Sequence, residues 1–230
     1  MDTNVIAERT LARIRALPSR YTPFIRAVRK DLSAELRDAA ARDVIAIGEA
    51  LVRHEPRWVG YEIIAHHRAA LGSLRIKDVE RIGLLDSWYS VDAFGMAISG
   101  PVWRAGQIKD SDIRRWAKAK DFWWRRVALV STVPLNTKSR GNGFQTGRTL
   151  AVAELLIDDR EDMVVKALSW ALRMLAARDP KAVRAFLNRH AGRLAARVKR
   201  ETNTKLVTGT KNKSKKGLVR PTGGSKPARV

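Results

Sequence analysis

The sequence predicts an all-α fold in which consecutive amphipathic helices stack into a curved α-α superhelix. Apolar residues recur at spacings of three and four from about residue 3 to residue 200, with charged residues between them. Strand-like alternation of apolar and polar residues is scarce. Proline and glycine residues divide the periodic segments into lengths typical of single helices.

The periodic segments form a series of expected helices joined by short connections. They cover residues 3–16, 23–36, 39–54, 57–71, 76–84, 88–99, 109–118, 121–132, 147–157, 161–177, 180–189 and 192–202. Breaks are expected at Pro18, Pro56, Gly72-Ser73, Gly100-Pro101, Pro134 and Asp179-Pro180. A loose cadence of helix pairs, each about 35–45 residues long, favours a solenoid of HEAT-like repeats. A compact irregular bundle is the alternative.

Two segments differ from the helical pattern. Residues 134–147 (PLNTKSRGNGFQTG) are predicted to form a polar loop, because the glycines lack the spacing and the flanking strand of a dinucleotide-binding turn. Residues 203–230 are rich in Lys, Gly, Thr and Ser, so we expect a disordered basic tail after a folded domain of residues 1–202. That tail either binds along the phosphates of a nucleic acid as a tether, or it only keeps the protein soluble.

The charge of the chain points to a polyanionic partner. The net charge is +22, and residues 201–230 account for +7 of it, which leaves +15 on the first 200 residues. Such an excess fits nucleic acid or an anionic membrane surface. Because the chain has no apolar run of about 18 residues and no signal-peptide pattern, we expect a cytoplasmic protein.

The composition argues against several kinds of chemistry. The chain has no cysteine, which excludes disulfides, thiolate nucleophiles and cysteine-type zinc sites. Its four histidines lack the spacing of a metal site, so we expect neither a metal nor another cofactor.

Trp170 lies on an unusual face of the helix expected over 161–177. The apolar stripe of that helix consists of Val164, Leu168, Ala171 and Leu175. At about 100° per residue, Trp170 lies well away from the stripe and shares a face with Lys166 and Arg173. An exposed indole between two cations suits stacking on a base or sugar beside phosphates, although most tryptophans of helical proteins belong to the core.

Two further helices carry candidate site residues. In the helix expected over 88–99, Trp88 and Asp92 share a face with Gly95 and Ser99, whose small side chains admit either a ligand or a neighbouring helix. In the segment FWWRRVALV, Arg126 lies on a partly apolar face while Arg125 points elsewhere. Arg126 therefore either extends its charge to solvent, pairs with a carboxylate, or reaches a phosphate.

Together these segments resemble the AlkD-like family of DNA alkylation repair glycosylases. Trp88-Tyr89-Ser90-Val91-Asp92 is similar to the family's Trp…Val-Asp segment, and the helix from Trp123 to Leu129 resembles its Trp-x-x-Arg-x-Ala helix. Lys166–Arg173 resembles its Lys-Ala-x-x-Trp-x-Leu-Arg helix, and Asp179–Val183 its Asn-Pro-x-x-Val step. The resemblance covers roughly residues 20–200. Tyr89 stands where members often carry an acid, and the 134–147 loop is longer than usual.

The resemblance implies a monomeric hydrolase that initiates base excision repair. Its HEAT-like solenoid would hold duplex DNA on a concave basic face and excise N3- and N7-alkylated purines. Binding to DNA would associate this cytoplasmic protein with the nucleoid. Asp92, Trp88, Trp170 and Arg126 would form the catalytic site, with Arg126 on the backbone. Expected DNA contacts are Lys166, Arg173, Arg125, Lys211, Lys213, Lys215 and Lys216.

Two other classes of function share the basic charge and the helical repeats. One is a non-enzymatic HEAT-like protein that binds DNA or acts as a scaffold. The other is a factor that associates with RNA or the ribosome, as the basic tail suggests. Asp92 favours the enzyme, because a protein that only binds DNA gains nothing from a carboxylate directed at the duplex.

Overall fold

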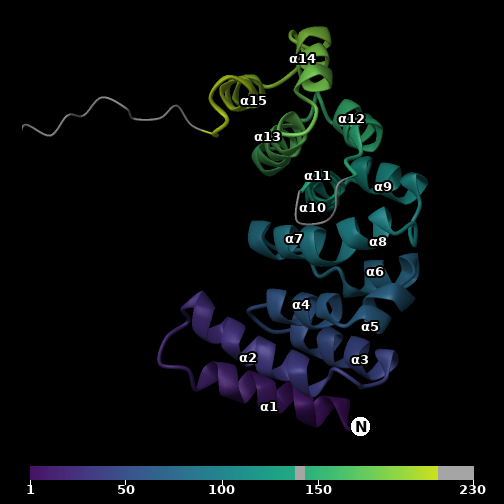
Figure 1. Cartoon of the computed structure of the whole chain (residues 1–230), viewed down its shortest axis with the longest axis vertical. Helices are drawn as coiled ribbons and strands as arrows, with labels where there is room; N and C mark the ends of the chain where they lie inside the picture. Colours follow the sequence, from purple (N-terminus) through teal and green to yellow (C-terminus); the bar gives the residue numbers. More distant parts are fainter. Residues whose placement is uncertain (138–142, 212–230) are drawn as a thin grey trace, which may run out of the picture.

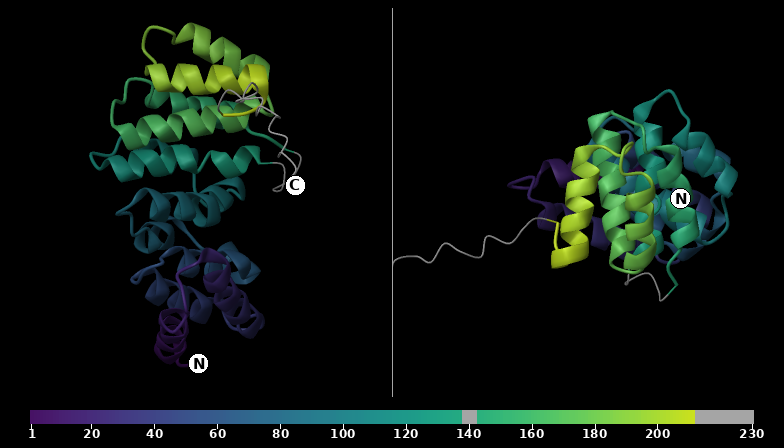
Figure 2. Two further views of the ribbon diagram at one scale, coloured as in Figure 1. Left: turned by 90° about the vertical axis from the view of Figure 1, so that its left-hand side faces the viewer. Right: turned by 90° about the horizontal axis from the view of Figure 1, so that it is seen from above.

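A computed structural model shows the chain as a stack of helices, and it describes residues 1–137 and 143–211. Within these ranges every regular element is helical, which confirms the predicted all-α superhelix. Figure 2 shows the helices layered along the long axis, with the N-terminus at one end and α14 and α15 at the other. In these two ranges no helix is long and apolar enough to cross a bilayer.

Six helices form the inner row of the stack, and each packs against the next. They are α2 (Thr22–Glu35), α4 (Trp58–His66), α7 (Trp88–Phe94), α10 (Phe122–Val130), α13 (Asp162–Ala176) and α15 (Ala196–Thr208). In Figure 1 the stack bends, so that α2 at one end and α15 at the other extend beyond α7 and α10 between them. The inner row therefore lies on the inside of a curve.

The remaining helices cover the outer side or connect the layers. They are α1 (Thr3–Arg15), α3 (Ala41–Val52), α5 (Arg68–Ser73), α6 (Ile76–Ile82), the π-helical segment η1 (Gly95–Ser99), α8 (Gly100–Arg104), α9 (Asp110–Ala117), α11 (Val133–Asn136), α12 (Thr146–Leu155) and α14 (Pro180–Arg189). One continuous hydrophobic core runs between the two sides, from Ile6 near the N-terminus to Val198 on α15.

The expected break at Gly100-Pro101 is wrong. The helix that begins at Trp88 widens into the π-helical segment η1, where the Gly100 N–H donates to the Gly95 carbonyl, and then continues as α8. Pro101 has no N–H, but it stands at the start of α8, where a proline is tolerated. The chain thus forms one continuous helical rod from Trp88 to Arg104, and Asp92 lies in its first part.

Two other boundaries differ from the sequence prediction. The helix expected over 57–71 divides at His67, whose backbone is extended and whose ring Nδ1 accepts from the Ala70 N–H. The last helix begins at Ala196 and continues to Thr208, so the basic tail starts later than residue 203. The predicted 134–147 loop is shorter at both ends, because α11 covers Val133–Asn136 and α12 starts at Thr146.

Candidate functional site

Helix α7 carries Asp92 and is fixed at its start by polar contacts. Ser87 caps the helix, its Oγ accepting from the Ser90 N–H at 3.4 Å. The neighbouring Asp86 accepts from Arg57 Nε at 3.2 Å and from Ser90 Oγ at 3.2 Å, which ties the start of α7 to the start of α4. The first turn of α7 therefore has a defined position before any ligand arrives.

The small residues of α7 and η1 admit a neighbouring helix. A Cβ on Gly95 would lie 2.4 Å from Val130 Cγ1 on α10. Ser99 is buried and its Oγ lies 2.6 Å from Ser131 Oγ. Of the two interpretations of this face, the structure supports the protein neighbour. Only Trp88 and Asp92, nearer the start of the helix, remain available to a ligand.

Asp92 forms a bidentate ion pair with Arg126 of α10. Asp92 Oδ1 accepts from Arg126 Nε at 3.0 Å and from Nη2 at 2.8 Å, and Oδ2 accepts from Nη2 at 2.9 Å. The Arg126 side chain is 6% exposed and that of Asp92 is 20% exposed. The third nitrogen of Arg126, Nη1, donates to the Met163 carbonyl at the start of α13. Among the three roles open to Arg126, pairing with a carboxylate is the one observed.

Burial raises the pKa of Asp92 above its ordinary value, and the charge and hydrogen bonds of Arg126 oppose that shift. Arg126 also fixes the direction of the carboxylate. About four lone-pair positions exist on a carboxylate, and three hydrogen bonds to Arg126 leave part of Oδ2 accessible from the pocket.

The pocket beside Asp92 has a volume of about 520 Å³ and opens on the inner row. Its lining comprises Asp92, Arg126, Lys166, Trp170, Arg173, Arg197, Glu201 and Lys211. The four residues of the predicted apolar stripe of α13 are buried, whereas Trp170 is partly exposed. The helical phase therefore placed Trp170, Lys166 and Arg173 correctly on one face, and the fold brings that face to Asp92.

Trp88 lies one helical turn before Asp92 on α7 and is 56% exposed. It is not among the residues that line the pocket, and its ring packs edge-on against Tyr89 with centroids 6.0 Å apart. Residues four apart on a helix lie on the same side. Trp88 thus flanks the pocket from the Asp92 side while Trp170 lines it.

Arg125 lies apart from this pocket. Its Nε donates to Asp159 at 2.7 Å and its Nη1 donates to the carbonyls of Ala119 and Lys120. These bonds fix the turn before α10 to the turn before α13. Of the lysines expected to contact DNA, Lys166 and Lys211 reach the pocket, whereas Lys213, Lys215 and Lys216 lie outside the described residues.

Glu201 is a pocket residue that the sequence reasoning missed. It lies on α15, is 15% exposed, and accepts from Ser169 Oγ at 2.7 Å. Arg173 Nε lies 3.7 Å from the same carboxylate and Lys211 Nζ lies 4.0 Å from it. Burial lowers the pKa of Arg173, and the charge of Glu201 opposes that shift. A signal was present, because Glu201 is the single acid after residue 200.

The cations of the pocket give it the charge that a phosphate-bearing ligand requires. Lys166 Nζ pairs with Asp162 at 2.7 Å, and Arg197 Nη1 pairs with the other oxygen of that carboxylate at 2.6 Å. Because all these side chains are at least partly exposed, the pairs are weak and a phosphate can displace them. No group of three metal-ligating side chains occurs in the described parts of the chain.

A comparison with protein families shows to which family this chain belongs. A model of the family described as DNA alkylation repair enzyme matches residues 20–206. The chain belongs to the DNA alkylation repair enzyme family. This confirms the resemblance inferred from the motifs of α7, α10 and α13, and it gives the protein a DNA-binding role in alkylation repair. No curated protein and no solved structure matches the chain.

Proposed function

We propose that this member of the DNA alkylation repair enzyme family is a DNA glycosylase for cationic N3- and N7-alkylated purines. The observation that carries the proposal is the Asp92 carboxylate, which Arg126 orients at the edge of the same pocket that Trp170 lines. The reaction is hydrolysis of the glycosidic bond in duplex DNA, and its product is an abasic site that starts base excision repair.

The leaving group explains why the pocket needs no proton donor. Alkylation at N3 or N7 gives the purine a positive charge, so the base departs as a neutral molecule when the bond to C1′ breaks. The bonding electrons leave with the base. The pocket presents two carboxylates to a developing positive charge, Asp92 and Glu201, and each lies beside a cationic side chain. The pocket is therefore suited to stabilise a cation.

Asp92 would act on the sugar. Positive charge develops on the deoxyribose as the bond breaks, as in glycoside hydrolysis generally. A fixed carboxylate stabilises that charge without having to reorient, and its accessible Oδ2 can accept a proton from the attacking water. Trp170 and Trp88 would hold the cationic nucleotide through their π faces, each contributing about 0.5–2 kcal/mol. Lys166, Arg173 and Lys211 would bind flanking phosphates.

The test is release of 7-methylguanine or 3-methyladenine from methylated duplex DNA by the purified protein. Asp92→Asn is expected to lower the single-turnover rate by a factor on the order of 100, because one preorganised electrostatic contact contributes about 2.7–4 kcal/mol. DNA affinity should persist. Asp38→Asn is the matched control, since Asp38 is an exposed acid in the turn after α2.

The Asp92–Arg126 pair also supports a second candidate, a repair protein that binds DNA without cleaving it. A purely structural ion pair between neighbouring helices has the same geometry. Absence of base release from every cationic alkylpurine, in wild-type protein that binds the duplex, would select this second function. Release that is equally fast in wild type and Asp92→Asn would instead remove Asp92 from the mechanism.

A further inference from the structure

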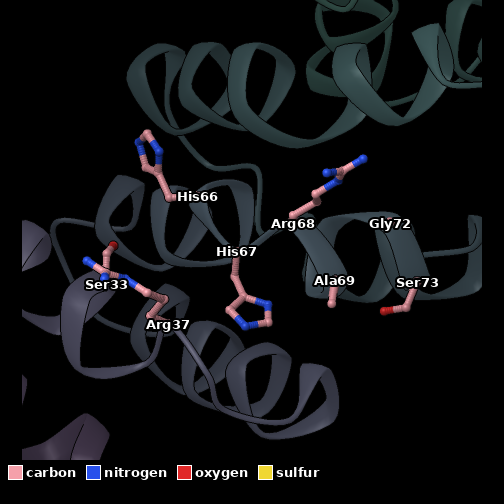
Figure 3. Close-up of a pocket in the computed structure, with 8 residues that line it drawn as sticks. All are labelled: Ser33, Arg37, His66, His67, Arg68, Ala69, Gly72 and Ser73. Carbon is pink, nitrogen blue, oxygen red and sulfur yellow. The ribbon is translucent and has the colours of Figure 1, made fainter.

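A second pocket lies where α2, α4 and α5 meet, and it carries no chemistry assigned so far. Its volume is about 830 Å³. The lining comprises Ser33, Arg37, His66, His67, Arg68, Ala69, Gly72 and Ser73. Figure 3 shows Ser33 and Arg37 to one side of the joint between α4 and α5, and His67 and Arg68 at the joint with their side chains directed away from each other. No carboxylate belongs to this lining, in contrast to the pocket beside Asp92.

The two arginines of this second pocket have no acidic partner among the described residues. Arg37 and Arg68 are exposed, and within residues 1–137 and 143–211 neither side chain has an ion pair or a hydrogen bond. Many arginines of the chain do pair with acids, as Arg57 does with Asp86. His67 accepts from the Ala70 N–H through Nδ1, so its neutral ring carries its proton on Nε2 as a further donor.

The backbone does not cancel this positive charge. Helices α2 and α4 end beside the pocket, and each C-terminus contributes roughly half a negative charge that solvent screens. The two guanidinium groups carry a full charge each. They also offer planar pairs of N–H donors, a geometry that matches the oxygens of a phosphate.

A third and smaller pocket lies next to the second one, against the helix that carries Asp92. It has a volume of about 230 Å³ between α4 and α7, shares His66 with the second pocket, and includes Ala93, the residue after Asp92. Its other lining residues are Glu62, Ala65, Met96 and Ala97. Glu62 is neutralised by Arg29, whose Nε lies 2.9 Å from it. The one acid among these lining residues is thus already paired.

We propose that the pocket at the α4–α5 joint binds the sugar-phosphate backbone of the duplex whose damaged nucleotide lies at Asp92. Arg37 and Arg68 each bind a phosphate, and His67 offers one further N–H donor through Nε2. Phosphate contacts carry no sequence information, but they fix the position of a protein on the duplex. The site therefore sets which nucleotide comes to rest at Asp92. This inference depends on the proposed function only for the location of the lesion.

The test uses the full chain and undamaged duplex DNA. The double variant Arg37→Gln/Arg68→Gln is compared with wild type by measuring affinity over a range of salt concentrations. Each lost phosphate contact lowers the slope of log affinity against log salt by about 0.9, so the slope should fall by about 2.

A matched control removes the same charge from the outer side. Arg114 on α9 and Arg189 on α14 are exposed and have no ion pair among the described residues. Arg114→Gln/Arg189→Gln should leave the slope within a few tenths of wild type. Equal slopes in the two double variants would overturn the proposal, as would weaker binding by the Arg37/Arg68 variant with an unchanged slope.

Duplex length locates the effect. On a long duplex with a central lesion the Arg37/Arg68 variant should bind more weakly than wild type, and on a duplex shortened around the lesion the two should converge. A constant difference at every length would contradict a separate backbone site. Binding to undamaged DNA needs no catalysis, so this test does not depend on glycosylase activity. A protein without that activity can still show the backbone site, and an active glycosylase can still lack it.

Discussion

The pockets at Asp92 and at the α4–α5 joint are both open and both rich in cations, yet their side chains differ in kind. The Asp92 pocket contains two carboxylates and an indole, and each carboxylate has a cationic neighbour. The lining of the pocket at the joint contains no acid, and its two arginines have no ion pair within the part of the chain that the structure describes. The side chains of the joint suit phosphate binding, because a phosphate site needs free cations. Those of the Asp92 pocket suit the proposed reaction, because a site for a sugar cation needs an oriented anion.

The largest change should follow from removing the group that orients the anion. Arg126→Ala leaves Asp92 partly buried without its partner, which costs about 3–5 kcal/mol of folding stability. The rate of base release should fall at least as far as in Asp92→Asn. Thermal unfolding and single-turnover kinetics measure the two effects.

The double variant Arg126→Ala/Asp92→Asn separates stability from chemistry. Removing the carboxylate charge should recover most of the lost stability while the enzyme stays inactive. If Arg126→Ala keeps both its melting temperature and its rate, the carboxylate needs no orienting partner. The proposed contrast between the two pockets would then be incorrect.

The indoles should give an intermediate effect. Trp170 lines the pocket, so Trp170→Ala is expected to slow base release about tenfold, within the range of one cation–π contact. Trp88 only flanks it, so Trp88→Ala should slow the reaction less. Trp58→Ala on α4 is the control, because Trp58 lies outside the pocket beneath Arg26. A larger loss in Trp88→Ala than in Trp170→Ala would reverse the assignment.

The smallest effect is the pH dependence of base release. Since burial raises the pKa of Asp92, the carboxylate accepts a proton at a higher pH than an ordinary aspartate, whose pKa is about 4. The rate should be full above the raised pKa and decline as the pH falls through it. A rate profile from pH 4 to 8 measures the midpoint. A midpoint at or below 4 would contradict the burial of Asp92.

Glu201 provides the control for the pH profile. It is the other carboxylate of the pocket, and its hydrogen bond and ion pairs within the described residues are with Ser169, Arg173 and Lys211 and not with Asp92. Glu201→Gln should therefore leave the midpoint unchanged. A midpoint that disappears in Glu201→Gln would assign the titration to Glu201.

The sequence predicted the helices and the exposed face of α13, because hydrophobic periodicity reports which side of a helix is buried. It could not decide the role of Arg126, since the partner Asp92 lies 34 positions away and only the packing of α7 on α10 brings them together. The same limit applies to Glu201, whose neighbours are Ser169 and Arg173.

The expected break at Gly100-Pro101 was wrong for a local reason. Glycine followed by proline usually ends a helix, but one π-helical turn, closed by the bond from Gly100 to Gly95, let the rod continue. A shift from four-residue to five-residue hydrogen bonding leaves no trace in the spacing of apolar residues. Prediction from periodicity alone therefore favours the commoner outcome.

Arg126 bonds at once to α7 through Asp92 and to α13 through the Met163 carbonyl. Because one side chain bonds to helices of three successive layers, we expect it to restrict how far these layers can rotate on one another. Under the proposed function, the direction of the Asp92 carboxylate would then stay constant while the two ends of the curve adapt to a distorted duplex.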